Sequence, residues 1–452
     1  MKVGAVLVRT IRHFFPELNA WMDAIQDPRF LPFVVYHKRF LLWWGLCLFL
    51  FKLGSRRQLD FELDAAGTRV LDNLNRLAGT QQRTRPVHKT LNYFLGRIGP
   101  QPLVDLRTRL VRRLLRMRVL DAARLQGHWV VAIDGTGYLV FRQRHCEHCL
   151  ERRYGEVTLY LHQVLEAKLL GPEGLVVSLG TVFIDNSDTA DTPADADPER
   201  RKQDCELKAF NRLDTHLRQL YPQLAICYSG DSLFGCGRGL AVGHEPRRAF
   251  VYVLKPGRLP TLWQEFQTLL PLCPKQRREV RTAAGVQQVY RWVHDLSYTD
   301  AEQRTWSVTA VQCEETVDGQ TTTWAWVTKL EVTAETVIAV ATKGGRHRWH
   351  IENQAFNMQK NSGLNLEHVY SHRCWQAFYY LLQIAHLILQ LVEKGNLLRQ
   401  LAQEWGKTPA QLFGSLKNIA QRLLDSFRFV RIPEDAYDPV AAARIQIRLD
   451  SS

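Results

Sequence analysis

The spacing of hydrophobic residues divides the chain into helical and β-rich parts. In the first 125 residues apolar side chains recur every three or four positions, most regularly over 101–118, and this spacing predicts helices. From His128 onward short apolar runs rich in β-branched and aromatic residues indicate buried strands. We expect a helix over 203–220, a further helix before the last strand, and five strands, at 129–133, 157–169, 175–184, 224–228 and 250–254.

A second group of strands is predicted in residues 255–343. Its apolar runs lie near 280–293, 306–311 and 322–327, and Asp318-Gly319 is a typical hairpin turn between the last two. After this β-rich insertion, helical spacing returns over 346–360 and 375–398, where one apolar face suits either a core or a subunit interface. The Asp-rich stretch 185–198 is expected to be a mobile loop.

The order of the first strands is informative about the fold. Three strands, a helix, a strand, a helix and a strand are the layout of a ribonuclease H-like fold, in which the first and fourth strands are neighbours. The predicted class is α/β, with a ribonuclease H-like catalytic core, a β-rich insertion and flanking N- and C-terminal helical regions. The expected divisions are a basic helical region 1–125, the first part of the core 126–254, the insertion 255–343, a core helix 344–372 and a helical region 373–452.

The strongest apolar run, Phe40 to Phe51, bears on membrane association. It has 12 residues, whereas a membrane-spanning helix needs about 20. The run also lies too far from the start of the chain for a secretory signal. We therefore expect a buried core helix in a soluble, cytoplasmic protein with no membrane partner.

Positive charge is concentrated at the N-terminus. Residues 1–125 contain 22 Lys and Arg against 9 Asp and Glu, a net charge of +13, which leaves +1 of the total +14 for the rest. Such asymmetry predicts a polyanionic partner, either nucleic acid or an anionic membrane, with a merely solvated basic surface as the alternative. Four arginines share one face of the helix over 101–118 and suit phosphate contacts, although an ordinary amphipathic surface helix has the same pattern: Arg109, Arg112, Arg113 and Arg116.

Three acidic residues stand at points where a nuclease needs them. Asp134 lies on or just past the first strand, Asp231 follows the fourth, and Glu352 lies on a helix after the fifth. Phosphoryl transfer on DNA by two metal ions needs a few hard oxygen ligands that converge on one point. We therefore expect these three carboxylates to be the catalytic and metal-binding residues.

At this point the chain resembles the DDE-type transposases of bacterial insertion sequences, in the branch with a β-rich insertion before the catalytic Glu. The matching stretches are Lys52-Leu53-Gly54-Ser55-Arg56-Arg57, Ile133-Asp134-Gly135-Thr136, Tyr160-Leu161-His162-Gln163-Val164-Leu165-Glu166-Ala167, Gln203-Asp204-Cys205-Glu206, Gly230-Asp231-Ser232-Leu233-Phe234 and Arg348-Trp349-His350-Ile351-Glu352-Asn353. The resemblance implies Mg²⁺- or Mn²⁺-dependent DNA cleavage and strand transfer, with two ions. The implied partners are double-stranded terminal inverted repeats and target DNA, bound by a dimer.

The third motif of that family is Tyr-x2-Arg-x3-Glu-x6-Lys. Arg348 precedes Glu352 by four residues, so both lie on one helical face, where Arg348 can hold a DNA phosphate; a surface ion pair is the alternative. The Tyr position is Gly345, and the Lys position is Gln359, with Lys360 one residue later. Lys360 is a candidate DNA contact that is turned away from the Glu352 face.

Two further features each allow two interpretations. Trp324 and Trp326 alternate on a predicted strand and suit either base stacking at a DNA end or the core of the insertion. Cys146 and Cys149 can supply half of a tetrahedral Zn²⁺ site, but the interleaved His145 and His148 lie too close to the pair to be expected as ligands, so two reduced buried cysteines are the simpler account.

Two other functions compete with an active transposase. A transposase-derived DNA-binding protein without cleavage fits the missing Tyr and the shifted Lys, although three intact carboxylates argue against it. A ribonuclease H-like nuclease without strand transfer would use the same three carboxylates.

Overall fold

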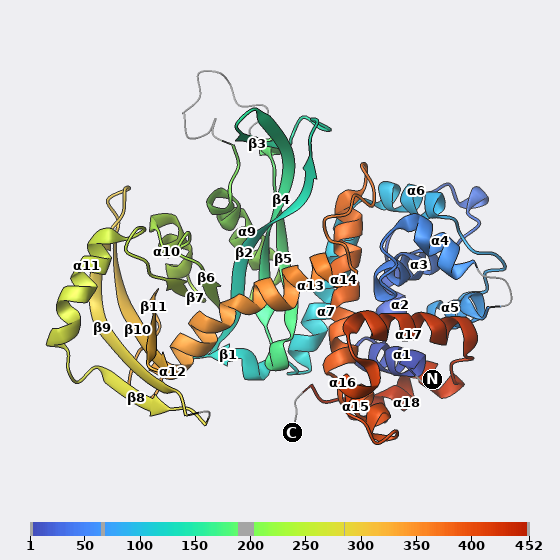
Figure 1. Cartoon of the computed structure of the whole chain (residues 1–452). Helices are drawn as coiled ribbons and strands as arrows, with labels where there is room; N and C mark the ends of the chain where they lie inside the picture. Colours follow the sequence, from blue (N-terminus) through green and yellow to red (C-terminus); the bar gives the residue numbers. More distant parts are fainter. Residues whose placement is uncertain (1–2, 65–67, 189–202, 284, 450–452) are drawn as a thin grey trace. The chain divides into compact units, whose positions relative to one another are not determined.

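The computed structural model describes residues 3–64, 68–188, 203–283 and 285–449 and divides into two compact units (Figure 1). The helical unit comprises Met1–Asp121, Pro172–Val177 and Gln354–Ser452, and the mixed unit comprises Ala122–Gly171 and Ser178–Asn353. The segment 344–372, expected to belong to the core, is divided between the units after Asn353. Most of the predicted acidic loop 185–198 lies outside the described residues.

Helix α3 (Lys38–Leu50) is the centre of the helical unit. It carries the strongest apolar run, and Phe40 to Leu50 are buried, which confirms the predicted core helix. Among the described residues, no helix combines the length and the apolarity needed to cross a bilayer. The other main helices of this unit are α1 (Val3–Phe14), α2 (Leu18–Asp23), α4 (Arg56–Leu63), α5 (Val70–Ala78), α6 (His88–Ile98), α7 (Gln101–Arg116), α14 (Trp375–Lys394), α15 (Asn396–Gln403), α16 (Pro409–Phe413), α17 (Leu416–Phe429) and α18 (Pro439–Arg444).

Helix α14 packs against α3 and α7 within this unit (Figure 1). Its side chains from Ala377 to Val392 are all buried, so its apolar face belongs to the core. The prediction of one continuous helix over 375–398 was wrong, because the backbone of Gly395 is extended and a new helix, α15, begins at Asn396.

The mixed unit is built on one large sheet. Its strands follow the order β3-β4-β2-β6-β7-β11-β10-β9-β8, with β1 also paired to β2 and β5 also paired to β4. The β2–β6 and β6–β7 pairings are parallel, and the pairings β1–β2, β2–β4, β3–β4, β7–β11, β8–β9, β9–β10 and β10–β11 are antiparallel. The strands are β1 (Arg124–Leu125), β2 (His128–Phe141), β3 (Leu150–Tyr154), β4 (Val157–Leu170), β5 (Val176–Ile184), β6 (Ile226–Gly230), β7 (Arg248–Val253), β8 (Arg277–Arg281), β9 (Gln287–Thr299), β10 (Thr305–Val317) and β11 (Gln320–Thr328).

The five predicted strands and two predicted helices of the first part are confirmed. They are β2, β4, β5, β6 and β7, with α9 (Glu206–Leu220) before β6 and α10 (Gly237–His244) before β7. Strand β2 is longer than expected, since it pairs with β4 as far as Phe141. The edge strand β3 was missed because its sequence, Leu-Glu-Arg-Arg-Tyr, is largely polar and exposed.

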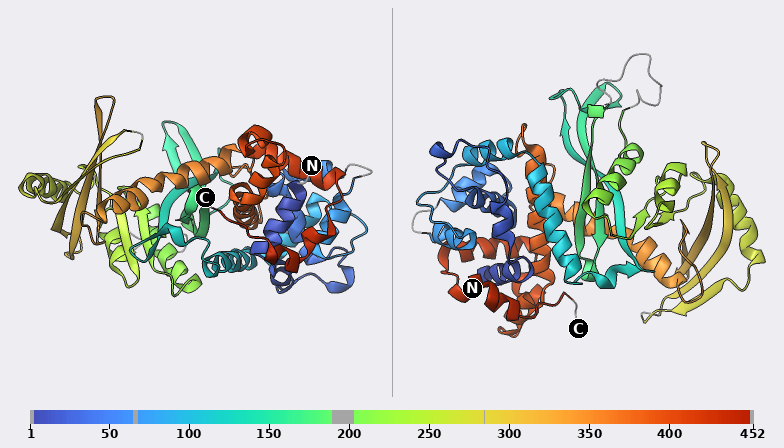
Figure 2. Two further views of the ribbon diagram at one scale, coloured as in Figure 1. Left: turned by 90° about the horizontal axis from the view of Figure 1, so that it is seen from below. Right: turned by 180° about the vertical axis from the view of Figure 1, so that it is seen from behind.

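The insertion extends the central sheet. Strand β11 pairs with β7 through Trp326 and Val253, so the four strands β8–β11 continue the sheet on its β7 side, beside α11 (Pro260–Leu269) (Figure 2). The Asp318-Gly319 hairpin turn is confirmed, because β10 and β11 pair on either side of it and both turn residues have positive φ, 50° and 77°.

The helical segment after the insertion is irregular. A helix was predicted over 346–360, but α12 (Val337–Ala339) continues as a π-helical turn (Val340–Gly345), a 3₁₀ turn (Arg346–Trp349), a second π-helical turn (Ile351–Phe356) and α13 (Asn357–Asn361). The first π-helical turn lies close to the sheet: Ser229 of β6 donates a hydrogen bond to the carbonyl oxygen of Gly344 (2.5 Å). A Cβ on Gly345 would overlap the indole ring of Trp326.

We expect Gly345→Ala to destabilise the mixed unit. The added methyl group must displace a buried tryptophan, and this overpacking should outweigh the gain of about 1 kcal/mol that alanine normally gives inside a helix. The expected net loss in the free energy of unfolding is about 1–2 kcal/mol, measured by chemical denaturation. Gly257→Ala is the control, because a Cβ at Gly257 meets nothing within 4 Å. Equal stability of the two variants would contradict the close packing at Gly345.

Candidate functional site

Asp134 and Asp231 lie just beyond the end of the parallel ladder between the neighbouring strands β2 and β6. The parallel ladder between β2 and β6 ends at Ala132 and Ser229, and each aspartate lies two residues beyond that point. Residues just beyond the carboxyl end of a parallel ladder lie side by side, which is where α/β proteins place their sites. Asp231 is held there by a hydrogen bond from the backbone N–H of Leu233 to its Oδ1 (2.8 Å).

Arg348 joins Glu352 to Asp134. Its Nη1 lies 3.7 Å from Oδ2 of Asp134 and 3.6 Å from Oε1 of Glu352. The contact with Glu352 is the ion pair named above as the alternative, and a contact of Arg348 with a DNA phosphate stays a prediction. The carboxylates differ in exposure: the Asp134 side chain is 17% exposed and that of Glu352 is 56% exposed.

A fourth carboxylate, Glu206, lies beside this group. It is the first residue of α9, and a Cβ added to Gly135 would overlap its carboxylate, so the Glu206 side chain covers the backbone next to Asp134. Glu206 ends the stretch Gln203-Asp204-Cys205-Glu206 that resembles the transposases, but the sequence predicts no role for it. An acidic residue in the first turn of a helix is common because it favours the helix dipole, so its position alone did not indicate a site.

The crowding of these groups changes their protonation. Burial raises the pKa of Asp134 to about 7; Arg348 opposes the shift, and the carboxylates of Glu352, Glu206 and Asp231 reinforce it. Burial, reinforced by Asp231, also raises the pKa of Glu206, and Arg152 opposes that shift. A divalent cation among these groups would relieve the repulsion between carboxylates that adds to the effect of burial on both pKa values.

The carboxylates of Asp134, Glu206, Asp231 and Glu352 are called the acidic group below. Their donor chemistry fits a hard cation such as Mg²⁺, which binds through a few carboxylate oxygens and retains water. The oxygens of these carboxylates lie farther apart than the ligands of a closed metal site. Among the described residues, no three of the four carboxylates have oxygens that all lie within 4.8 Å of one another, and Arg348 lies between two of them.

Lys360 and Gln359 belong to the helical unit. Lys360 Nζ lies 2.7 Å from Oε1 of Glu367, so its described partner is a carboxylate of its own unit. Gln359, at the position where the family motif has Lys, is fully buried and donates hydrogen bonds to Gln383 and His386 (2.9 Å each). The motif position is therefore used for core packing in this chain.

The two tryptophans of β11 differ in their surroundings. Trp326 is 2% exposed and packs against Gly345. It is therefore a core residue of the insertion, and base stacking would require its exposure. Trp324 is half-buried, and the guanidinium of Arg346 lies 4.3 Å from its ring centre. Arg346 is in turn paired with Glu315 (2.7 and 3.1 Å).

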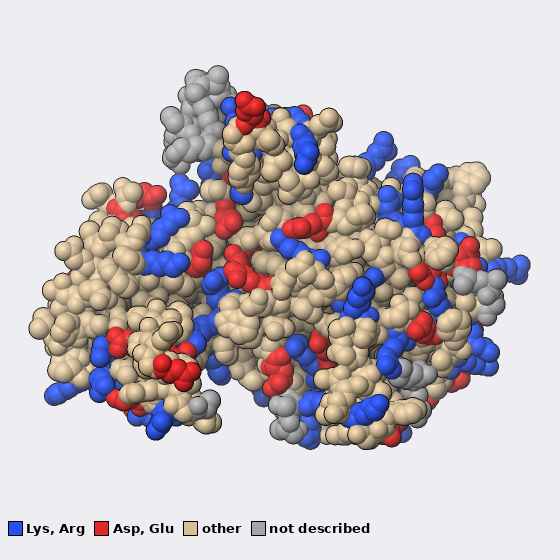
Figure 3. All heavy atoms as spheres, viewed as in Figure 1, with Lys and Arg blue, Asp and Glu red and all other residues tan. Residues whose placement is uncertain are grey.

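The arginines of α7 keep the predicted face, opposite the buried Leu103, Leu106, Leu110 and Leu114. Arg109, Arg112 and Arg116 are exposed, while Arg113 is half-buried with its Nη1 3.8 Å from Oε1 of Glu17. On the face drawn in Figure 3, basic side chains are interspersed with acidic ones. Contact between the arginines of α7 and DNA stays a prediction.

No protein-family model and no curated protein matches the chain. One solved structure with some similarity is the cryo-EM structure of the piggyBac transposase synaptic complex with hairpin DNA. The match covers 93% of this chain and 80% of that chain, with a TM-score of 0.34 and 8% sequence identity. This similarity is too low to assign a fold or a function.

We expect Asp134→Asn to change how stability depends on pH in chelator-treated protein. An aspartate whose pKa rises on folding destabilises the folded chain once the unfolded chain ionises, so the penalty begins near pH 3.8, grows up to about pH 7 and is then constant. The variant removes this penalty. Its advantage over the wild type should therefore grow across that window to on the order of 4 kcal/mol, measured by chemical denaturation.

Glu265→Gln, at an exposed carboxylate on α11, is the control for this experiment. A difference between Asp134→Asn and the wild type that stays constant from pH 4 to pH 8 would contradict the raised pKa of Asp134.

Proposed function

We propose that the mixed unit is a ribonuclease H-like core and that the protein is a DDE-type transposase, which cleaves DNA and transfers the cut strand. The observation that carries the proposal is the gathering of Asp134, Asp231 and Glu352 near the end of the β2–β6 ladder, with Arg348 between two of them. The strand order β5-β4-β2-β6-β7 supports the fold. Along the chain β2 is the first and β6 the fourth of these five strands, and the two are parallel neighbours.

Within this proposal, Asp134, Asp231 and Glu352 would hold two Mg²⁺ or Mn²⁺ ions, which would stabilise charge on the attacking and leaving oxygens of the phosphodiester. Glu206 adds negative charge beside Asp134, and with a raised pKa it is suited to hold or accept a proton near the site.

Arg348 has a further role in the proposal. Its guanidinium compensates the charge of Asp134 and Glu352 in the protein alone, and a guanidinium can also bind a phosphate through two hydrogen bonds. We propose that Arg348 exchanges its contact with a carboxylate for a DNA phosphate when substrate and metal bind.

Contacts with DNA outside the site rest on the charge of the N-terminal region. The net +13 of residues 1–125 and the exposed arginines of α7 support binding to the phosphate backbone of the inverted repeats and target DNA. Binding as a dimer, which holds two DNA ends together, is proposed from the resemblance alone.

A cleavage assay on DNA that flanks the gene on both sides tests the proposal. With Mg²⁺ or Mn²⁺ the purified protein should nick the element ends, and Asp231→Asn should lower the rate by at least about 100-fold while leaving end binding intact. Glu265→Gln is the matched control. Full cleavage by Asp231→Asn would contradict the site assignment.

The same assay separates the competing functions. Joining of cut 3′ ends to target DNA supports a transposase, and cutting without joining supports a nuclease. End binding without any metal-dependent nicking supports a DNA-binding protein that does not cleave.

A further inference from the structure

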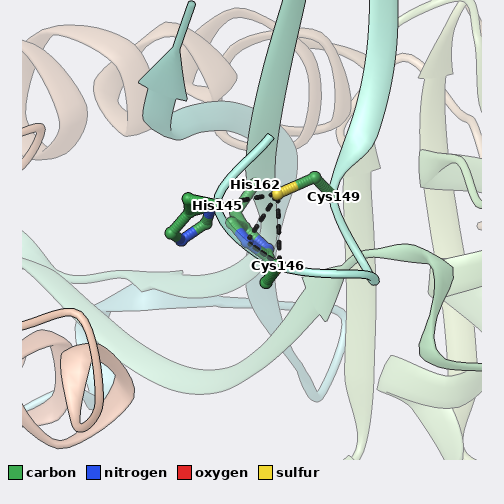
Figure 4. Close-up of side chains that lie close together, drawn as sticks. All are labelled: His145, Cys146, Cys149 and His162. Atoms are coloured by element: carbon green, nitrogen blue, oxygen red, sulfur yellow. Dashed lines mark hydrogen bonds between the residues drawn. The ribbon is translucent and has the colours of Figure 1, made fainter. Parts of the chain in front are cut away.

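Four metal-binding side chains converge in the loop between β2 and β3, apart from the acidic group (Figure 4). His145, Cys146 and Cys149 come from the loop, and His162 comes from the neighbouring strand β4. One nitrogen or sulfur atom of each lies within 4.8 Å of the others, and in the described part of the chain no second group of three or more His, Cys, Asp or Glu side chains is as close.

Four distances between these atoms approach those between the ligands of a tetrahedral zinc site, and the shortest lie slightly below them. The two sulfurs are 3.1 Å apart, Nδ1 of His145 is 3.0 Å from the Cys149 sulfur, and Nε2 of His162 is 3.3 and 3.6 Å from the Cys146 and Cys149 sulfurs. With zinc–sulfur bonds of about 2.3 Å and zinc–nitrogen bonds of about 2.0–2.1 Å, neighbouring ligand atoms of a tetrahedral site are roughly 3.3–3.8 Å apart. A small outward movement of the side chains would therefore admit an ion.

We propose that His145, Cys146, Cys149 and His162 bind one structural Zn²⁺ ion. Two thiolates with two imidazoles are a donor set that selects zinc over the hard cations suited to the acidic group. Four protein ligands fill a tetrahedral coordination shell and leave no position for water or substrate, so the ion is structural.

Phe141 and Asn186 hold the loop between β2 and β3 in position around the proposed zinc ligands. The ring of Phe141 stacks on His145 with ring centres 4.0 Å apart. Asn186 donates its side-chain amide to the carbonyl oxygen of Cys149 (3.1 Å) and its backbone N–H to the carbonyl oxygen of His148 (2.8 Å). These contacts order the loop before metal binds.

The proposed ion is connected to the acidic group through the chain. Asn186 also accepts a hydrogen bond from the backbone of Asp204 (3.3 Å), and the Gln203 side chain pairs with both backbone groups of Glu151 on β3 (2.7 and 3.1 Å). Gln203 and Asp204 lie just before Cys205, the N-cap of α9, whose first residue is Glu206. By fixing the β2–β3 loop, zinc would fix the segment that positions Glu206.

Metal analysis of the purified full-length chain tests the proposal. We expect about one zinc per chain, and its loss in Cys146→Ser/Cys149→Ser and in His162→Ala. His148→Ala is the matched control, because His148 lies in the same loop but outside the cluster, and it should retain zinc.

A second measurement covers variants that fail to fold. The wild-type chain, stripped of metal and given Co²⁺, should show the visible absorption of tetrahedral, thiolate-bound cobalt. The proposal is overturned if the wild type carries no zinc and gives no such spectrum, if Cys146 and Cys149 form a disulfide in the freshly purified protein, or if a folded His162→Ala retains full zinc. Since the ion is structural, these results are independent of whether the protein cleaves DNA.

Discussion

The carboxylates around Asp134 repel one another, and the mixed unit is arranged so that they nevertheless lie together. Burial and three acidic neighbours raise the pKa of Asp134 to about 7, even though Arg348 partly compensates their charge. Such crowding costs stability unless a cation or a proton neutralises it. The sheet provides the framework, because the parallel pairing of β2 with β6 brings Asp134 and Asp231 to the same end of that ladder.

Two glycines allow the remaining carboxylates to approach. Gly135 leaves room for the Glu206 side chain next to Asp134, and Gly345 leaves room for Trp326 under the irregular helix that carries Arg348 and Glu352. The absence of Tyr at position 345 thus has a steric reason, since even a methyl group there would overlap the indole ring. In the same way Gln359 is buried in hydrogen bonds with other core residues, which explains why a Lys is absent from that position.

Hydrophobic patterning was sufficient to predict the strands that carry the acidic residues, because these strands are buried and apolar. Hydrophobic patterning failed where the structure of a segment depends on more than the local order of apolar and polar residues. Strand β3 is polar and exposed, the interruption of α14 depends on the backbone of Gly395, and the π-helical turns around Glu352 have no pattern of their own. Glu206 lies far along the chain from Asp134, and His162 lies on a different element from Cys146 and Cys149, so only the pairing of strands and the packing of α9 place them.

A crystal structure of the full chain with Mn²⁺, with the ion located by its anomalous scattering, tests the central claim most directly. The account predicts manganese among Asp134, Asp231 and Glu352, with Glu206 nearby and Arg348 withdrawn from at least one carboxylate. Manganese bound only elsewhere at saturating concentration, with Arg348 still joining Asp134 to Glu352, would contradict it.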